Sequence, residues 1–313
     1  MAGGYPRAVT TEALIRVDPA DFERWRAQVV ALDDAARRER GHEELGESVW
    51  RDLTRPGADS VGFFAGERAY LHLARAEAGA ASWTIGIVRH PDRRDPRDVR
   101  DLLGAAVTFA AERGGGLLTA WVFGVTDADS DPFTAAGFAA TRTLLEMRAP
   151  LPAGVEPRWP PYVRVRTFVP ERDDAEWLAV NNRAFADHPE QGGWTAATFR
   201  ARQREPWFDP QLFLLAFDDA GLAGFNWLKL HDAQAPDPVL GEIYVIGVDP
   251  RAQGTGLGRA LAVAGLDAVA ARGATVATLF CAADNAGAVS LYRSLGFATH
   301  RTDRAFTRAV AAA

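Results

Sequence analysis

The sequence repeats one stretch of itself, and this repeat limits the possible folds more than any other feature. Residues 85–142 align with residues 244–301 without a gap, at an offset of 159 residues, as in the pair Pro91 and Pro250. Further matches at this offset are Arg113-Gly114 with Arg272-Gly273, Gly137-Phe138 with Gly296-Phe297, and Arg142 with Arg301. Self-similarity of this length indicates two copies of one folding unit.

The length of the chain agrees with two domains. At about 100 to 200 residues per domain, 313 residues predict two modest domains, and 48% hydrophobic residues suffice for two cores. A proline-rich stretch at residues 149–161 lies between the copies and is typical of a linker. We therefore predict an α/β (α+β) chain with an N-terminal domain at residues 1–152, a linker at 153–161 and a C-terminal domain at 162–313.

The second copy contains a glycine-rich loop between an apolar strand and a helix. Residues 241–260 read GEIYVIGVDPRAQGTGLGRA, with Gly254, Gly256 and Gly258 just before the helix. Glycine lets the backbone turn sharply and expose its N–H groups, and the helix N-terminus adds the positive end of its dipole. The segment predicts a phosphate or pyrophosphate site with the carboxylate of Glu242 nearby. A tight turn without a ligand would also explain the loop by itself.

Two common nucleotide-binding motifs do not fit this loop. A dinucleotide motif requires G-x-G-x-x-G, but the sixth residue counted from Gly254 is Arg259. A Walker motif requires Lys and then Ser or Thr after its last glycine, and here Arg259 and Ala260 follow Gly258. The sequence therefore excludes a Rossmann-type dinucleotide site and a P-loop site at this position.

The loop and the segments after it resemble the GNAT acetyltransferase superfamily. Residues 253–258, QGTGLG, are similar to its Q/R-x-x-G-x-G/A acyl-CoA loop, and a β-rich run at 274–282 and a helix at 286–296, AGAVSLYRSLG, follow in the same order. The resemblance implies tandem GNAT domains, each a mixed, splayed β-sheet flanked by helices, with acetyl-CoA bound between two central parallel strands. The cofactor-binding residues that it implies are Ile246, Gly247, Val248, Gln253, Gly254, Thr255, Gly256, Leu257, Gly258, Arg259 and Asn285.

The same resemblance implies two catalytic residues. Glu242 lies on the strand beside the acyl-CoA gap, where its carboxylate could take a proton from an attacking amine. Tyr292 precedes the L-G-F ending and matches the tyrosine that protonates the departing CoA thiolate. Backbone N–H groups around residues 246–248 would meet the oxyanion. Plainer explanations stay open, since Glu242 could face solvent at a strand start and Tyr292 could fill a core edge.

The first copy lacks these features. Opposite Gly254, Thr255, Gly256 and Gly258 it has Asp95, Pro96, Arg97 and Val99, and opposite Glu242, Tyr292 and Asn285 it has Trp83, Phe133 and Thr126. Proline has no N–H group, and the Asp95 carboxylate repels a pyrophosphate. We therefore predict that the N-terminal domain is a degenerate copy that supports the second one.

Further segments resemble the mycothiol synthase family, a group of tandem GNAT enzymes. They are LAVNNRAFADHPEQGGW at 178–194, EPWFDP at 205–210 and LLEMRAPL at 144–151. The resemblance implies acetylation of the cysteinyl amine of a cysteine–glucosamine–inositol conjugate (Cys-GlcN-Ins), a small sugar–inositol amine. Candidate substrate-binding residues are Glu47, Glu190, Lys229 and Glu242, and Lys229 is the only lysine among 35 basic residues. Simple exposure at the surface would also explain Glu47 and Lys229.

Composition argues against several other classes of protein. The single cysteine, Cys281, excludes an intramolecular disulfide, and the six histidines lack metal-ligand spacing, so we expect no metal. A net charge of −6 argues against a nucleic-acid partner, and no long apolar run or signal-peptide pattern is present, so we expect no membrane partner. We expect a monomeric cytoplasmic enzyme. Two other functions stay open: acetylation of another small amine, such as an aminoglycoside or polyamine, and non-catalytic sensing of acyl-CoA.

Overall fold

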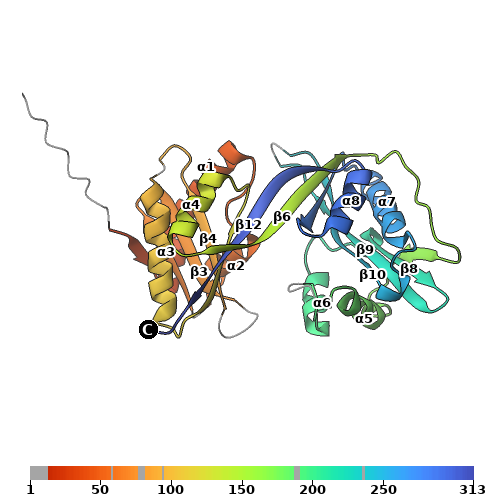
Figure 1. Cartoon of the computed structure of the whole chain (residues 1–313), viewed down its shortest axis with the longest axis horizontal. Helices are drawn as coiled ribbons and strands as arrows, with labels where there is room; N and C mark the ends of the chain where they lie inside the picture. The colour runs from red at the N-terminus through yellow and green to blue at the C-terminus, as the bar shows by residue number, and fades with distance from the viewer. Residues whose placement is uncertain (1–12, 58, 77–81, 94, 187–190, 235–236) are drawn as a thin grey trace, which may run out of the picture. The chain divides into compact units, whose positions relative to one another are not determined.

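The structure is a computed structural model that describes residues 13–57, 59–76, 82–93, 95–186, 191–234 and 237–313. The chain forms two compact units of mixed α/β structure (Figure 1). The first unit contains the residues up to Leu144 together with Arg301–Ala313, and the second contains Leu145–His300. The predicted α/β class is therefore confirmed.

In the first unit, helices cover both faces of a mixed sheet. Its elements are β1 (Ile15–Val17), α1 (Phe22–Arg40), α2 (Glu47–Thr54), β2 (Ser60–Ala65), β3 (Ala69–Arg75), β4 (Ser82–Arg89), α3 (Pro96–Ala111), β5 (Gly116–Val122), α4 (Asp127–Ala135) and β12 (Ala298–Val310). The strands lie in the order β1-β2-β3-β4-β5-β12, and β4 and β5 are parallel. Apolar residues of α1 and α2 pack on one face, and those of α3 and α4 pack on the other.

The second unit has the same plan. Its elements are β6 (Ala139–Pro150), β7 (Arg164–Thr167), α5 (Asp174–Ala184), α6 (Ala196–Gln203), β8 (Phe213–Asp218), β9 (Gly221–His231), β10 (Leu240–Val248), α7 (Leu257–Ala270), β11 (Val276–Ala282) and α8 (Ala286–Ser294). The strands lie in the order β6-β11-β10-β9-β8-β7, and β10 and β11 are parallel. Helices α7 and α8 cover one face and α5 and α6 the other (Figure 1).

The last strand of each sequence copy pairs in the sheet formed mostly by the other copy. Arg304–Val310 of β12 pair with β5 of the first copy, and β6 of the first copy lies next to β11 of the second. The compact units are therefore defined by packing and differ from the predicted division at residues 152 and 162, which follows the repeat in the sequence. That division of the sequence stays a prediction.

The elements of the two copies follow one another at the offset found in the sequence. Helix α4 begins and ends 159 residues before α8, and α3, β5 and β6 start within two residues of the same spacing from α7, β11 and β12. Similar sequence patterns have thus formed similar elements in both halves.

Helix α7, which follows the glycine-rich loop, approaches β9 closely. A Cβ atom at Gly265 would lie 2.2 Å from Nδ2 of Asn226, so only glycine fits there without rearrangement. The Asn226 amide donates a hydrogen bond of 2.9 Å to the carbonyl of Leu261. The second and third turns of α7 are therefore held against the middle of β9.

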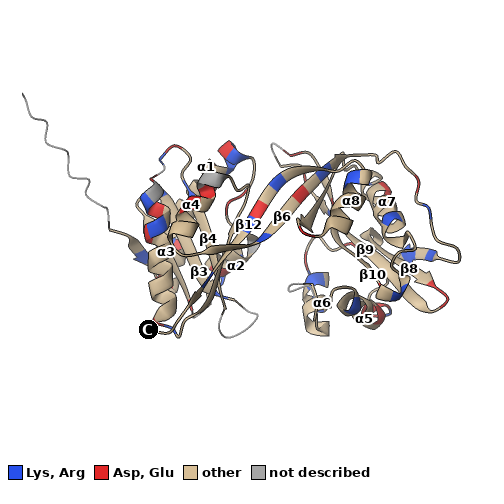
Figure 2. Ribbon diagram, viewed as in Figure 1, with Lys and Arg blue, Asp and Glu red and all other residues tan. Residues whose placement is uncertain are grey.

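Charged residues of both signs are interspersed over both units (Figure 2). Examples are the ion pair of Arg89 with Asp129 in the first unit and that of Arg183 with Asp249 in the second. Within the described ranges, no helix combines the length and the apolar character that a membrane crossing requires.

Candidate active site

Strands β10 and β11 are paired over only part of their length. Leu240–Ile243 lie opposite Val276–Leu279, and beyond this point Val245–Val248 are paired with β9 on their other side. In the described part of the sheet, the edge of Tyr244–Val248 that faces β11 has no strand partner. Backbone N–H groups on this edge are therefore free of a strand partner and face a gap between two parallel strands, and the role of residues 246–248 stays a prediction.

A β-bulge lies where the two strands separate. The register between β10 and β9 shifts between Ile243 and Val245, which makes Tyr244 an extra residue. A bulge bends its strand and interrupts the alternation of side chains. Ile243 packs with the α7 and α8 cluster, whereas Val245 and Tyr244 pack with the aromatic cluster under α5 and α6.

Glu242 is buried on the face covered by α5 and α6, just before the gap. It is 7% exposed, and its Oε2 lies 2.6 Å from Nε2 of His231 on β9. A solvent-facing position is therefore excluded. A buried carboxylate that is hydrogen-bonded to a histidine can accept a proton from a bound group. Sequence reasoning missed His231, although its two-residue spacing from Lys229 places both on one strand face.

Lys229 and aromatic rings extend this face beside Glu242. Lys229 is directly opposite Glu242 on β9, so both side chains point to the same side. The Lys229 Nζ lies 4.8 Å from the centre of the Trp207 ring. That ring is 4.8 Å from the Tyr244 ring, measured between centroids. The structure therefore brings Glu242 and Lys229 together and adds Trp207 and Tyr244 to them.

The glycine-rich loop has the backbone geometry of an anion site. Gly254 and Gly256 have φ angles of 76° and 86°, which favour glycine, and a Cβ atom at either would meet no atom within 4 Å. Gly256 is the N-cap of α7 and provides no capping side chain. The first N–H groups of α7 have no acceptor within the helix, so they are available to a ligand. Leu257 is 1% exposed and can contribute only its backbone.

Side chains around the loop hold it in place. The Thr255 hydroxyl donates to the Ala252 carbonyl at 2.8 Å, and a guanidinium N–H of Arg259 donates to the Ser294 hydroxyl at 2.5 Å. Gln253 is exposed, and a Cβ atom at Gly258 would lie 3.5 Å from the Val248 side chain.

A pocket of about 550 Å³ opens beside the first turn of α7. Arg158 and Arg259 line it together with Glu156 and apolar residues such as Val263. Two guanidinium groups near a helix N-terminus suit a polyphosphate ligand. Arg158 lies in the proline-rich stretch, where no motif pointed to it.

Tyr292 lies on the opposite face of the sheet from Glu242. It is 7% exposed within the α7 and α8 cluster and makes an edge-to-face contact with Phe297, with ring centroids 5.8 Å apart. Burial, and to a smaller extent Cys281, raises the pKa of the Tyr292 phenol, so that it keeps its proton at neutral pH. The side chain therefore fills a core position and is also a protonated donor. Asn285 is the N-cap of α8 and accepts a hydrogen bond of 3.1 Å from the Ala288 N–H.

Two predicted substrate-binding residues are not described. Glu190 lies outside the described residues, and for Glu47 the structure gives only the backbone position at the start of α2. In the described part of the chain, no group of three or more His, Cys, Asp or Glu residues is placed to hold a metal ion.

The corresponding loop of the first copy is closed to an anion by its own side chain. The Asp95 carboxylate accepts a hydrogen bond of 2.9 Å from the Arg97 N–H, and Pro96 is the first residue of α3. One free N–H group is thus satisfied internally and a second is absent. These contacts leave fewer N–H groups for an anion, and the loss of the phosphate site in this copy stays a prediction.

The structure corrects one pair in the alignment of the copies. Glu242 is paired with Thr278 of β11, and the residue of β4 that is paired with the corresponding position of β5 is Thr84, not Trp83. The gapless alignment is wrong here because Tyr244 is an insertion in β10, which shifts the register before the bulge by one residue.

Comparison with known proteins identifies similar sequences. Residues 177–297 match the model of the acetyltransferase (GNAT) family. A mycothiol acetyltransferase from Thermomonospora curvata is 43% identical, and the match covers 88% of this chain and 91% of that protein. One from Thermobispora bispora is 40% identical, with coverage of 96% and 100%.

Solved structures share the fold of the whole chain. A GCN5-related N-acetyltransferase from Sphaerobacter thermophilus has a TM-score of 0.73 at 21% identity, with coverage of 95% of this chain and 96% of that one. A tandem GNAT protein from the clavulanic acid biosynthesis pathway has a TM-score of 0.69 at 18% identity, with coverage of 95% and 98%. The tandem arrangement of GNAT folds therefore extends along nearly the whole of this chain and of the clavulanic acid pathway protein.

Proposed function

The chain belongs to the mycothiol acetyltransferase family, and on this premise we propose that it transfers the acetyl group of acetyl-CoA to the cysteinyl amine of Cys-GlcN-Ins, which yields mycothiol. The observation that carries the proposal is the gap between β10 and β11, with Glu242 on one side and Tyr292 on the other. The first copy has Thr84 and Phe133 at these positions, so we assign the reaction to the second unit.

The glycine-rich loop is the proposed binding site for the pyrophosphate of acetyl-CoA, which supplies the acetyl group. Residues 253–258 would donate backbone N–H groups, and Arg259 and Arg158 would meet further phosphate oxygens from the adjoining pocket. Residues 246–248 would bind along the pantetheine arm and donate an N–H group to the thioester oxygen. Asn285 would contact the same arm from the start of α8.

Glu242 is the proposed general base. The acceptor's α-amine has an ordinary pKa of about 7.7 to 8.0, so roughly a tenth to a fifth of it is neutral at pH 7. Glu242 takes the proton from the nitrogen, directly or through a water molecule, as the carbon–nitrogen bond forms. The hydrogen bond from His231 holds the carboxylate in place and offers a route for the proton toward solvent, because His231 is partly exposed.

Tyr292 is the proposed general acid. As the carbon–sulfur bond breaks, its phenol donates a proton to the CoA thiolate. The raised pKa of Tyr292 keeps the phenol protonated before this step. Proton uptake on one face and proton release on the other then balance over the reaction.

The face beside Glu242 is the proposed site for the sugar and inositol. Lys229 can donate hydrogen bonds to hydroxyl oxygens, and the Trp207 and Tyr244 rings provide a rigid apolar surface. Glu190 and Glu47 stay candidates for hydroxyl groups. We also propose that the two copies arose by internal duplication, and a monomeric, cytoplasmic enzyme without metal stays our expectation.

Mass-spectrometric detection of the acetylated product tests the function. The full chain is incubated with acetyl-CoA and Cys-GlcN-Ins, an aminoglycoside or a polyamine. We expect acetylation of the conjugate on nitrogen, with its thiol still reactive toward a maleimide. Turnover of the other amines alone would favour a different N-acetyltransferase. Binding of acetyl-CoA without any transfer would favour a sensor.

A further inference from the structure

The motif LLEMRAPL at residues 144–151 places two charged side chains on one face of the second unit. Most of the motif lies in β6, where Met147 and Ala149 pack with the α7 and α8 cluster. Side chains alternate between the two faces of a strand, so Glu146 and Arg148 point to the opposite face. This is the face on which the proposed base is buried. Neither charged residue takes part in the proposed acetylation.

Arg148 joins two carboxylates on this face. Its Nε donates a hydrogen bond of 2.6 Å to Oε1 of Glu146, and its two terminal nitrogens donate to the two carboxylate oxygens of Asp237 at 2.5 Å and 3.0 Å. The Glu146 side chain is 4% exposed and that of Arg148 is 17% exposed. Hydrogen bonds between a guanidinium and carboxylates are directional, and shielding from water strengthens them. Glu146, Arg148 and Asp237 are called the Arg148 clamp below.

One arm of the Arg148 clamp leads to the strand beside the proposed base. The Thr278 hydroxyl on β11 donates to Oε1 of Glu146 at 3.4 Å. Thr278 is paired with Glu242 across the two parallel strands, just before the gap opens. Glu146 therefore contacts the residue that lies next to Glu242.

The other arm leads to the hairpin between β9 and β10. Asp237 lies in this hairpin, where it exchanges backbone hydrogen bonds of 3.0 Å and 2.8 Å with Gln234. His231 is the last residue of β9, and its Nε2 lies 2.6 Å from Oε2 of Glu242. The end of a strand frays unless other contacts hold it. The bonds from Arg148 to Asp237 therefore restrain the chain that follows His231.

The sheet of the first unit forms without such a clamp. At the offset of 159 residues, β12 has Ala305 and Thr307 at the positions that Glu146 and Arg148 have in β6. Strand β12 lies beside β5, as β6 lies beside β11, so these positions also correspond in the structure. The fold by itself therefore does not require a charged pair at this place.

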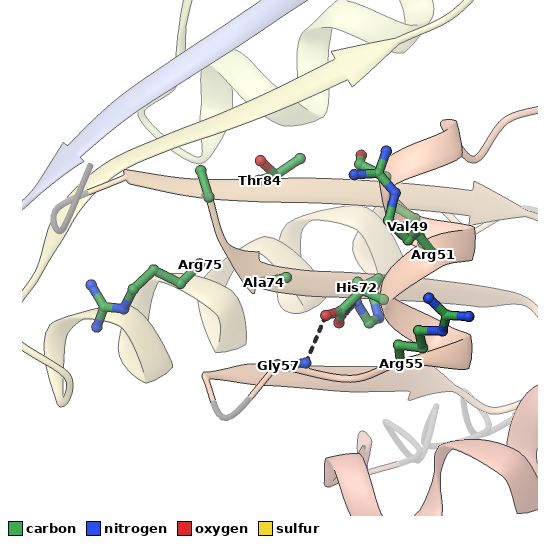
Figure 3. A pocket seen from close by; sticks show the side chains of 11 residues that line it. Val49, Arg51, Arg55, Gly57, His72, Ala74, Arg75 and Thr84 are labelled. Atoms are coloured by element: carbon green, nitrogen blue, oxygen red, sulfur yellow. Dashed lines mark hydrogen bonds and ion pairs between the residues drawn. The ribbon is translucent and has the colours of Figure 1, made fainter. Parts of the chain in front are cut away.

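The proposed base is missing from the first unit as well. Thr84 stands in place of Glu242, and Ala74 stands in place of Lys229. Thr84 and Ala74 line a pocket of about 420 Å³, so space is left where the second unit has its larger charged side chains (Figure 3). The clamp thus accompanies the proposed base and is absent where that base is absent.

We propose that Arg148 is a positioning residue that fixes the two neighbours of Glu242, on β11 and at the end of β9. The Glu242 carboxylate then keeps one orientation toward the attacking amine. Each guanidinium nitrogen of Arg148 already donates to a carboxylate, so Arg148 acts through other residues and is assigned no contact with the substrate. This inference rests on the proposed role of Glu242.

Asp237→Asn tests the clamp with little risk to folding, because the Asp237 side chain is 28% exposed and Glu146 keeps its bond to Arg148. The kcat/KM for Cys-GlcN-Ins should fall about tenfold, since a small displacement of a reacting group slows the reaction. The KM for acetyl-CoA should not change. Asp232→Asn is the matched control, because Asp232 is an exposed aspartate of the same hairpin, and it should change neither value.

A double-mutant cycle separates positioning from a general loosening of the fold. In a Glu242→Gln background, Asp237→Asn should lower kcat/KM by less than about twofold, because the carboxylate that the clamp orients is gone. A merely structural role would lower kcat/KM by the same factor in both backgrounds, and this result would overturn the proposal. An unchanged kcat/KM of Asp237→Asn in the wild-type background would overturn it as well.

Hydrogen–deuterium exchange gives a readout that does not depend on acetylation. Peptides that contain the ends of β9 and β10 should exchange at least about threefold faster in Asp237→Asn than in Asp232→Asn. Equal exchange in the two variants would overturn the proposal. Full activity of Glu242→Gln would count against the proposed base, and the exchange rates would then decide by themselves whether the clamp holds these strands.

Discussion

The proposed role of Glu242 leads to a pH-dependent prediction for Glu242→Gln. The amide keeps the size of the side chain, and its oxygen can still accept the hydrogen bond that His231 makes at 2.6 Å. The change therefore removes the base with little effect on packing. Glu171→Gln is the matched control, because Glu171 is an exposed glutamate of the same unit.

The magnitude follows from the acceptor and the site. A positioned base contributes about 10² to 10⁴ in rate, so kcat/KM at pH 7 should fall by that factor. At pH 9 nearly all of the α-amine is neutral, so about five- to tenfold of the loss should be recovered. The rest should remain, because the nitrogen must still lose a proton as the amide forms. The KM for acetyl-CoA should not change, since the α7 loop does not contact Glu242.

Quantitative mass spectrometry of the acetylated conjugate at pH 7 and pH 9 measures these rates without interference from the two thiols present. Equal activity of Glu242→Gln and Glu171→Gln at pH 7 would refute the assignment of Glu242 as the base. Complete recovery at pH 9 would show that the protein only lowers the amine pKa, and would remove the proposed proton transfer.

Three further changes test other parts of the protein. Tyr292→Phe should lower kcat about 10²-fold without changing the melting temperature. The activity of the wild type should not decline up to about pH 10, because burial raises the pKa of Tyr292. A loss of kcat below tenfold in Tyr292→Phe would contradict the proposed role. Gly256→Ala should raise the KM for acetyl-CoA about tenfold with kcat unchanged, since the φ of 86° at Gly256 is strained for alanine. The control Gly104→Ala should leave this KM unchanged. Steady-state kinetics measure both values. Burial raises the pKa of the Asp33 carboxyl to about 6. The unfavourable contribution of this carboxyl to the free energy of unfolding therefore grows as the pH rises toward and through 6. The free energy of unfolding of the wild type should therefore fall by on the order of 1 kcal/mol between pH 5 and pH 7.5, and Asp33→Asn should abolish this fall. Urea unfolding measures both. An unchanged dependence of the unfolding free energy on pH in the variant would contradict the prediction.

Local sequence patterns predicted the parts of the site that depend on neighbouring residues. The glycine-rich loop and the start of α7 are continuous in the chain. The sharp turn at Gly254 and Gly256, and the helix dipole that follows it, could therefore be recognised from the sequence. Glu242 and Tyr292 were found because each lies at a fixed distance from such a segment. Their placement on opposite faces of the sheet followed only from packing.

The sequence pattern did not predict the register of β10 at the bulge. The bulge at Tyr244 shifts β10 by one residue, so Thr84 and not Trp83 replaces Glu242 in the first unit. His231 was missed because its link to Glu242 is a cross-strand contact. Hydrophobic alternation specifies which face a residue takes in a regular strand, but it does not locate a bulge, and the extra residue of a bulge shifts the pairing of all the residues before it.

The sequence by itself indicated two copies of one α/β unit, and it predicted that only the second keeps the glycine-rich loop and the proposed acid–base residues. These properties depend on the local order of residues, on their spacing and on the positions of glycines. The tertiary structure decided which sheet each last strand joins, how His231 and Lys229 meet Glu242, and that a pocket remains in the first unit. These properties depend on hydrogen bonds between strands distant in the sequence, whose pairing is set by the packing of whole faces.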